Sequence, residues 1–291
     1  MSYEPRFTIT PALLGRVESI AALRERIQGA AVQVPWIPAL RKDTRARNTH
    51  SSTAIEGNPL TLEEVRALEE GAAVDAPARA SREVLNYFAA LRHVEKQAAR
   101  KRVTHEDIFR LHAIIAGDVM DQGEAGRYRT IRVRVGEFVP PPPEDVSGLM
   151  FELLEWWNRQ APRHSPVLSS AILHYRFEAI HPFADGNGRA GRAMALWELY
   201  RRGFDSHHIF AVDEFYWEDR PRYYAALDVS EVLPYEVPAS SEEALRVVYE
   251  RRPPRPLERA PDRRHREPAP APCRPARRDC RRKGPSAPCG R

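Results

Sequence analysis

Apolar residues recur at the spacing of an amphipathic helix through most of residues 11–203. A helix of this kind must bury its apolar face against another element, so a series of them favours a helical bundle. Apolar stripes or capping patterns that mark seven helices lie at residues 13–27, 61–64, 84–94, 104–115, 150–157, 168–179 and 194–200. Thr61 and Glu64, for example, have the spacing of a capping box. The sequence therefore predicts a mainly α-helical fold.

One segment has a different period. In residues 131–135, Ile-Arg-Val-Arg-Val, apolar and charged residues alternate strictly, which is typical of a strand. Gly136 and Glu137 supply a turn, residues 138–139 return, and the prolines at 140–143 force an extended exit. We expect one β-hairpin, which forms a flap on an otherwise helical fold.

Residues 251–291 differ from the rest of the chain in composition. They hold 14 Lys and Arg against four Asp and Glu, so they account for more than the whole net charge of +5. All three cysteines lie there, at spacings that form no CxxC pair, so we expect no zinc site. Because this segment has few aliphatic residues with which to offset its ordering entropy, we expect a disordered basic tail. The expected division is an N-terminal helical region (1–100), a core (101–228), a short segment (229–250) and the tail (251–291).

Composition also argues against several classes of protein. No run of about 18 apolar residues occurs, so we expect no membrane-spanning helix. Residues 1–10 lack the apolar core of a signal peptide, which makes a cytoplasmic protein the expectation. Without its tail the chain is acidic, so the basic net charge gives no support for nucleic-acid binding.

The polar chemistry is concentrated in residues 181–192, His-Pro-Phe-Ala-Asp-Gly-Asn-Gly-Arg-Ala-Gly-Arg, between two helical patterns. We expect Asn187 to cap the following helix. Gly186 and Gly188 remove side chains where the backbone must approach a ligand. The free N–H groups and the dipole of a helix start together favour an anion.

The charged residues of this segment indicate which anion. Arg189 and Arg192 are three positions apart on one helix face, and helical side chains lean towards the N-terminus, so both can reach the same anion. A polyphosphate fits this pair better than a single carboxylate does. Asp185 is placed to hold Mg²⁺ beside it, and His181 has the pKa of a general base near neutrality. These are the groups that phosphoryl or nucleotidyl transfer needs.

Residues 181–192 resemble the signature of the Fic family, H-x-F-x-[DE]-G-N-G-R-x-x-R, at every specified position. The resemblance extends over residues 5–228, including the prolines after the hairpin and the segment 222–227, Arg-Tyr-Tyr-Ala-Ala-Leu. It implies a Fic-type helical bundle with a hairpin flap. It also implies an enzyme that transfers AMP from ATP to a Ser, Thr or Tyr hydroxyl of a protein and releases pyrophosphate.

The resemblance implies a role for individual residues. His181 is the base, Asp185 holds Mg²⁺ and Arg192 meets the γ-phosphate. One tyrosine of the pair Tyr223 and Tyr224 flanks the adenine, with Tyr224 preferred. The residues expected to bind Mg-ATP are Gly186, Asn187, Gly188, Arg189, Ala190, Gly191, Arg192 and Tyr224.

Residues 52–58, Ser-Thr-Ala-Ile-Glu-Gly-Asn, resemble the inhibitory motif of the same family, [ST]-x-x-x-E-[GN]. This implies regulatory roles for Ser52 and Glu56. A Glu56 carboxylate paired with Arg192 would remove the arginine from the γ-phosphate and repel the nucleotide. The plainer interpretation is a helix that ends at Glu56, with Gly57 as its left-handed cap. The resemblance leaves open whether Glu56 acts within its own chain or across a homodimer.

Three other functions stay open at this stage. A related enzyme transfers phosphate, UMP or phosphocholine instead, although the retained Gly186 and Gly188 favour AMP. A second alternative is a DNA-associated regulator, although no helix-turn-helix pattern follows residue 227. The third is a scaffold without activity. The expected partners are ATP, a protein target that pairs with the edge of the hairpin, and the chain itself through self-modification.

Overall fold

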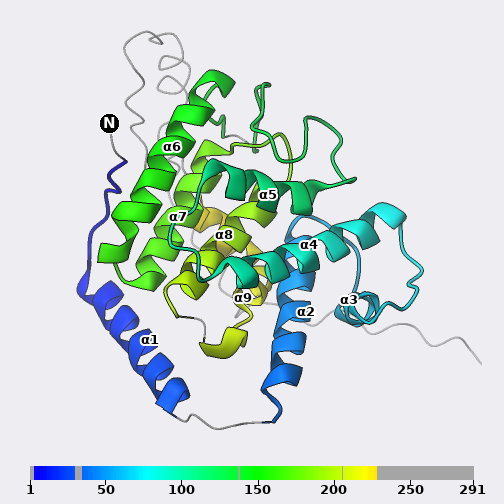
Figure 1. Cartoon of the computed structure of the whole chain (residues 1–291), viewed down its shortest axis with the longest axis horizontal. Coiled ribbons are helices and arrows are strands. Elements are labelled where there is room, and N and C mark those ends of the chain that lie inside the picture. Colours follow the sequence, from blue (N-terminus) through cyan, green and yellow to red (C-terminus); the bar gives the residue numbers. More distant parts are fainter. Residues whose placement is uncertain (1–2, 30–34, 137, 205, 228–291) are drawn as a thin grey trace, which may run out of the picture. The chain divides into compact units, whose positions relative to one another are not determined.

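The computed structural model describes residues 3–29, 35–136, 138–204 and 206–227. The segment expected at 229–250 and the tail expected at 251–291 lie outside the described residues. The described elements are α1 (Pro11–Gly29), α2 (Ile37–Ile55), α3 (Leu62–Glu69), α4 (Ala78–Gln97), α5 (His105–Ala116), α6 (Pro143–Arg159), η1 (Ala161–Arg163), α7 (Pro166–Ile180), α8 (Asn187–Arg201), η2 (Ser206–His208), α9 (Val212–Glu218) and α10 (Arg220–Leu227) (Figure 1). These ranges contain no regular strand, so the prediction of a mainly α-helical protein is confirmed.

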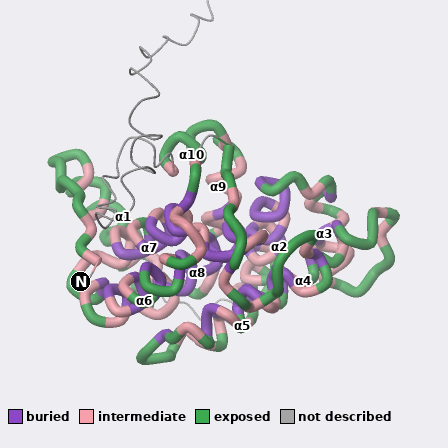
Figure 2. Tube along the Cα trace, turned by 90° about the horizontal axis from the view of Figure 1, so that it is seen from above, coloured by how far each residue is buried: buried purple, intermediate pink, exposed green. Residues whose placement is uncertain are grey.

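Helix α8 lies in the middle of the bundle, in contact with α4, α5 and α7 (Figure 1). Its residues from Asn187 to Glu198 are buried on every side apart from Gly188, and the buried trace in Figure 2 is concentrated around α7 and α8. The indole of Trp157 donates to the buried Glu198 carboxylate at 2.6 Å, and the Ser169 hydroxyl donates to its other oxygen at 2.6 Å. A buried carboxylate is tolerated when it is hydrogen-bonded in this way. The interior of the bundle therefore holds α8 from all sides.

The helix starts predicted at Thr61 and Thr104 are confirmed. Thr61 Oγ1 accepts from Glu64 N at 3.3 Å, and the Glu64 carboxylate accepts from Thr61 N at 2.7 Å. Thr104 and Asp107 form a second box at the start of α5. Each box satisfies N–H groups that a helix start leaves without partners.

Two helices lie where the pattern places them but bury other residues than expected. No residue of α1 is buried, and Ile20 and Leu23 of its apolar stripe are exposed. In α7, Ala171 of the predicted stripe is exposed, whereas Ser169 and His174 are buried. Helix α7 packs against both α6 and α8. Its covered surface is therefore too wide, and too polar, for a single apolar stripe to mark it.

The predicted β-hairpin is present only as a turn with one antiparallel bridge. Val135 and Phe138 exchange two backbone hydrogen bonds of 3.0 and 2.9 Å, and no regular strand extends from them in the described residues. Because Pro140 and the prolines after it lack N–H groups, the returning leg has only two donors to offer a ladder. The predicted turn is thus in the right place, but the predicted strands are too long. We call residues 131–141 the flap.

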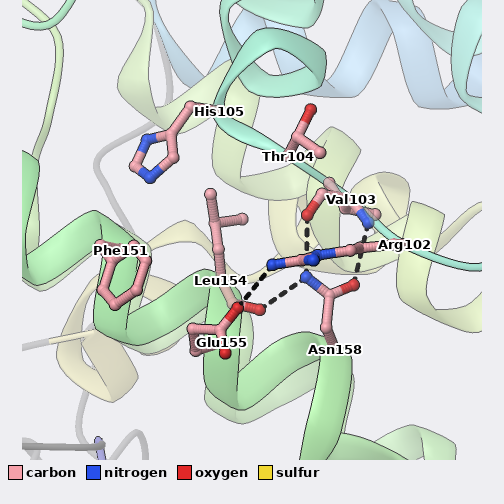
Figure 3. Close-up of a pocket in the computed structure, with 8 residues that line it drawn as sticks. All are labelled: Arg102, Val103, Thr104, His105, Phe151, Leu154, Glu155 and Asn158. Atoms are coloured by element: carbon pink, nitrogen blue, oxygen red, sulfur yellow. Dashed lines mark hydrogen bonds and ion pairs between the residues drawn. The ribbon is translucent and has the colours of Figure 1, made fainter.

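A hollow between the start of α5 and helix α6 involves none of the residues of the 181–192 motif (Figure 3). Asn158 accepts from Val103 N at 2.9 Å and donates to Val103 O at 2.8 Å, while Arg102 pairs with Glu155 at 2.9 Å. These contacts join residues 102–103, which precede α5, to α6. The polar residues that line the hollow therefore have a structural role.

Candidate active site

The loop from His181 to Gly186 joins α7 to α8 and brings the motif together. His181 ends α7, and its N–H donates to Phe177 O at 2.9 Å. His181 and Gly186 both lie in the left-handed region, with φ of 50° and 76°. For a residue other than glycine this conformation costs about 1–2 kcal/mol. Contacts around the loop must therefore stabilise His181 in its observed geometry.

The prediction that Asn187 caps α8 is wrong. Asn187 is the first residue of the helix, and the capping position belongs to Gly186, which makes no side-chain cap. The Asn187 side chain is buried, and it accepts from Phe183 N and donates to Phe183 O, both at 2.8 Å. The left-handed Gly186 turns the chain back so that Asn187 faces its own loop. The asparagine thus closes the loop with its side chain and leaves its backbone N–H for an anion.

His112 supports the same loop from α5. Its ring stacks on the buried Phe183, with centroids 3.6 Å apart. His112 Nδ1 accepts from Gly126 N at 2.8 Å, so Nε2 carries the proton that is donated to Asp185 O at 2.9 Å. Burial lowers the pKa of His112 to about 4. The neutral ring therefore holds the backbone at Asp185 with a single defined tautomer.

Arg189 presents donors without partners at the start of α8. It is 4% exposed, and in the described chain its Nε and Nη1 atoms make no hydrogen bond. The nearest carboxylates are Asp185, 3.6 Å from Nη2, and Glu83, 3.9 Å from Nη1. A buried guanidinium with free donors is costly in the absence of an anion. The orphaned donors fit the phosphate chain that the sequence predicts.

Arg192, by contrast, donates a hydrogen bond from each of its three side-chain nitrogens. It is 1% exposed, and its Nε donates to Ser52 Oγ at 2.7 Å, while Nη2 donates to Ser52 O at 2.9 Å and to Glu56 Oε1 at 2.7 Å. Its Nη1 donates to the Tyr223 hydroxyl at 3.1 Å. The Glu56–Arg192 pair that the resemblance implies is present, and Glu56 is also the residue after α2, with Gly57 left-handed behind it. The two interpretations of Glu56 are therefore compatible.

The Glu56 carboxylate covers the N-terminus of α8. A Cβ added to Gly188 would collide with Glu56 Oε1 and lie 3.2 Å from Arg192 Nη1. Desolvation raises the pKa of Glu56, but the charge and hydrogen bond of Arg192, followed by the charges of Arg189 and His181, leave the pKa below its ordinary value. Glu56 is therefore ionised at neutral pH. It occupies the anion-binding position as a negatively charged group of the protein.

The remaining predicted binding residues are placed less favourably. The Ala190 N–H already donates to Gly186 O at 3.0 Å, and a Cβ on Gly191 would collide with Glu178 on α7 rather than meet a ligand. The Tyr224 hydroxyl donates to Ile55 O at 3.2 Å, at the end of α2. The tyrosine that reaches Arg192 is Tyr223.

Helix α9 and the residues before it hold the helix that carries Glu56. Asn48 of α2 donates to Phe210 O at 3.1 Å and accepts from Asp213 N at 3.0 Å, and Arg47 pairs with Glu214 at 2.8 Å. The buried Asp213 accepts from the hydroxyl of Tyr87 on α4 at 2.8 Å. The C-terminal half of α2 is thus bonded to elements that follow the motif in sequence.

His181 is held as a neutral base. Burial lowers the pKa of His181 to about 4. A hydrogen bond to the Glu178 backbone carbonyl raises this pKa, whereas the positive charge of Arg129 lowers it further. In the neutral ring, a proton on Nδ1 donated to that carbonyl leaves Nε2 as the acceptor. The Glu178 carboxyl lies 3.8 Å from Nδ1, and burial raises its pKa to about 8. His181 can therefore accept a proton from a hydroxyl at neutral pH.

Three residues around the site were missed by the sequence reasoning: Arg129, Glu178 and Asp213. Glu178 is three positions before His181 on a helical pattern, so its side chain could have been placed on the same face. Nothing in the local pattern of Arg129 or Asp213 distinguishes either from a solvated charge.

A divalent cation has one suitable protein ligand here. The described residues contain no group of three His, Cys, Asp or Glu side chains that could hold a metal ion. Asp185 Oδ1 accepts from Gly186 N at 2.6 Å, and the Asp185 side chain is 37% exposed. Mg²⁺ commonly takes one or two carboxylates together with substrate phosphates. The residues present thus fit Mg²⁺ that arrives with a nucleotide.

The comparisons with known proteins agree with this geometry. The model of the Fic/DOC family matches residues 102–199. A Fic family protein of Desulfovibrio desulfuricans G20 is 34% identical, with a TM-score of 0.66 over 79% of this chain and 69% of that chain. Fic-1 (residues 134–508, a variant) of Caenorhabditis elegans is 30% identical, with a TM-score of 0.64 over 76% of this chain and 66% of that one. A helical bundle with this loop and helix defines a Fic fold, and the chain belongs to the Fic family.

Curated relatives carry the name of an activity. Protein adenylyltransferase fic-1 of Caenorhabditis elegans is 34% identical over 197 residues, which is 66% of this chain and 37% of that protein. Protein adenylyltransferase Fic of Aedes aegypti is 33% identical over 194 residues, which is 65% of this chain and 39% of that protein. The chain thus spans less than two fifths of the length of these relatives. Among the described helices of this chain, none is long and apolar enough to cross a membrane.

Proposed function

We propose that this chain transfers AMP from Mg-ATP to a Ser, Thr or Tyr hydroxyl of a protein, and that Glu56 restrains the reaction. The observation that carries the proposal is the arrangement at the start of α8. Two buried arginines lie in the first turns of α8, which follows the loop that begins at the neutral His181. Arg189 has two nitrogens that make no hydrogen bond in the described structure, and Arg192 is bonded to Glu56. The curated relatives named protein adenylyltransferase support the same activity.

The residues divide the reaction between them. The N–H groups of Asn187, Gly188 and Arg189 and the two guanidinium groups bind the phosphates. Asp185 would hold Mg²⁺, which supplies positive charge to the phosphates when bound.

The chemical step needs one proton acceptor. Nε2 of His181 takes the proton of the target hydroxyl as its oxygen forms a bond to the α-phosphorus. The bond from that phosphorus to the oxygen bridging to the β-phosphate breaks, and pyrophosphate leaves with the electron pair. Arg189 and Arg192 stabilise the negative charge of the leaving group.

Restraint follows from competition for Arg192. While Glu56 is bonded to Nη2, the Nε, Nη1 and second Nη2 hydrogen bonds of Arg192 go to Ser52 and Tyr223. A γ-phosphate would have to displace the Glu56 carboxylate, because two anions at one helix start repel each other. Release of Glu56 is therefore part of the proposed catalytic cycle. A cytoplasmic location, where ATP is abundant, belongs to the same proposal.

Labelled ATP distinguishes transfer of AMP from transfer of phosphate. With the Glu56→Gly variant, we expect label from ATP carrying it on the α-phosphate to enter protein, either a target in lysate or the chain itself. Label on the γ-phosphate should leave as pyrophosphate. Mass spectrometry of the modified peptide should show the AMP adduct. Protein labelled only from the γ-position would instead identify a phosphotransferase.

The pH dependence should reflect the lowered pKa of His181. Only the unprotonated ring accepts a proton, so a pKa of about 4 keeps the active form present well below neutrality. We expect kcat/KM of the Glu56→Gly variant to stay level from pH 8 down to about pH 6, below the ordinary histidine pKa of about 6.5, and to fall only at lower pH. The negative charge of Glu56 raises the pKa of His181. Its loss in this variant therefore moves the fall in kcat/KM to a still lower pH. A midpoint near pH 7 would contradict this assignment of the base.

A further inference from the structure

Arg129 is a buried cation whose hydrogen bonds go to backbone carbonyls. It is 4% exposed, and no carboxylate of the described residues forms an ion pair with it. Burial lowers the pKa of its guanidinium, and the charge of Glu144 only partly opposes this. Such a group is retained only if its donors are satisfied.

Its acceptors come from three separate segments. Nε donates to His181 O at 2.8 Å, and Nη2 donates to Ile180 O at 3.4 Å, both at the end of α7. Nη1 donates to Ile131 O at 3.1 Å, and Nη2 also donates to Pro141 O at 2.5 Å, so both legs of the flap are bound. The backbone N–H of Arg129 donates to Pro182 O at 2.9 Å. One side chain thus joins the base to both ends of the flap.

The chemistry of arginine suits this junction. The last carbonyls of a helix lack intrahelical partners, and a cation there is favoured by the helix dipole. The planar guanidinium has five donors in a fixed fork, whereas a lysine ammonium has three donors on a point charge and cannot span the same carbonyls. The contacts also oppose the strain of the left-handed His181.

We propose that Arg129 is a positioning residue, which sets the His181 base and the flap relative to each other so that a target segment lying along the flap presents its hydroxyl to Nε2. The expected kinetic effect rests on the proposed AMP transfer. The hydrogen bonds by which Arg129 joins the flap to His181 do not depend on that function. Arg129 touches no nucleotide-binding group of α8, so its effect falls on the target side of the reaction.

The kinetic test uses the full chain with Glu56→Gly, to which Arg129→Lys or Arg129→Gln is added. A displacement of about 1 Å costs about 10²-fold in rate, so we expect kcat to fall by about that factor in both variants. The dissociation constant of Mg-ATP should stay within about twofold, because the anion site is unchanged. Arg127→Gln is the matched control. Its side chain is 74% exposed and pairs only with Glu124 among the described residues, so it should behave as the parent does.

Two further readouts separate positioning from a general loss of fold. Amide exchange should accelerate at residues 131–135 and at Phe183 in both variants, while that of α6 and α8 stays unchanged. In an NMR titration, the pKa of His181 should rise in Arg129→Gln, which loses the positive charge, and should stay low in Arg129→Lys. The charges that oppose that of Arg129 are Glu56 after α2, where it is present, and Asp185 in the loop, while the backbone carbonyl of Glu178 raises the pKa of His181 through a hydrogen bond.

The outcomes are distinct. If Arg129→Lys keeps the parental rate and the parental exchange, the proposal is overturned. If Mg-ATP affinity and exchange of all helices change together with the rate, the role is general stability and the proposal is equally overturned. If the Glu56→Gly parent transfers no AMP, the proposed function fails, yet exchange and titration still decide whether Arg129 ties the flap to the base.

Discussion

Replacing Glu56 by glycine is expected to raise AMP transfer, including self-modification, by about 10²-fold. Breaking a buried ion pair costs about 3–5 kcal/mol, and the low end applies because the Glu56 side chain is 36% exposed. A cost of about 3 kcal/mol corresponds to about 10²-fold in the apparent affinity for the nucleotide. In the variant, Arg192 keeps its bonds to Ser52 and Tyr223 and regains Nη2 for a phosphate.

The measurement is incorporation of α-labelled AMP by equal amounts of the parent and the variant. Glu70→Gly is the matched control, because Glu70 is likewise the residue that follows a helix, α3, but pairs only with the exposed Lys42 among the described residues. Equal incorporation by the parent and Glu56→Gly would refute restraint by Glu56. A thermal midpoint that falls in Glu56→Gly and recovers with Mg-ATP would show that nucleotide has replaced the carboxylate as the partner of Arg192.

The held position of α2 supports the proposed restraint, because it places Glu56 against Arg192 in the described structure. Asn48, Arg47 and Ile55 each bond to a residue between Phe210 and Tyr224. Glu56 is therefore presented to Arg192 by a helix that is already in place, and little ordering entropy remains to oppose the ion pair. Any event that moves α9 or α10 would act on the same contact, since Tyr223 bonds directly to Arg192.

The sequence predicted those parts of the site whose residues lie close together along the chain. The spacing of His181, Asp185, Arg189 and Arg192 places them on one loop and one helix start, and the structure brings them together in that way. The partnership of Glu56 with Arg192 joins residues far apart in the chain, and it was predicted only through a resemblance to a family motif. The mainly helical fold followed from periodicity, because most helices in this bundle bury one face.

The features that escaped prediction depend on packing that no short pattern records. Asn187 has the chemistry of a cap, but the left-handed Gly186 turns it into the loop instead. Apolar and charged residues do alternate in residues 131–135. The length of a strand pair also depends on how many backbone N–H donors the returning segment has, and prolines have none. Arg129 resembles any surface arginine in sequence, and only the convergence of His181, Ile131 and Pro141 carbonyls gives it a role.

Replacing His181 is expected to abolish AMP transfer without abolishing nucleotide binding. Loss of a general base costs about 10²–10⁴-fold, whereas the proposed phosphate-binding groups are α8 and its arginines, none of which His181 contacts through a hydrogen bond in the described structure. The choice of substitute matters, because His181 is left-handed, and this conformation is adopted by histidine and asparagine more readily than by alanine. Asparagine tolerates that conformation and cannot act as a base near neutral pH, so His181→Asn separates loss of chemistry from loss of fold.

His181→Asn and its control are made in the Glu56→Gly background, where AMP transfer is expected to be large enough to measure a fall of this size. His207→Asn is the matched control, since His207 is an exposed histidine that also has a positive φ, of 69°. We expect Mg-ATP affinity within about twofold of the parent in His181→Asn, because its phosphate-binding groups are untouched. Label incorporation should be lost in His181→Asn and retained in His207→Asn. Retained incorporation in His181→Asn would show that another group takes the hydroxyl proton. The buried Glu178, 3.8 Å from Nδ1 of His181 and with a pKa of about 8, would then be the first residue to replace.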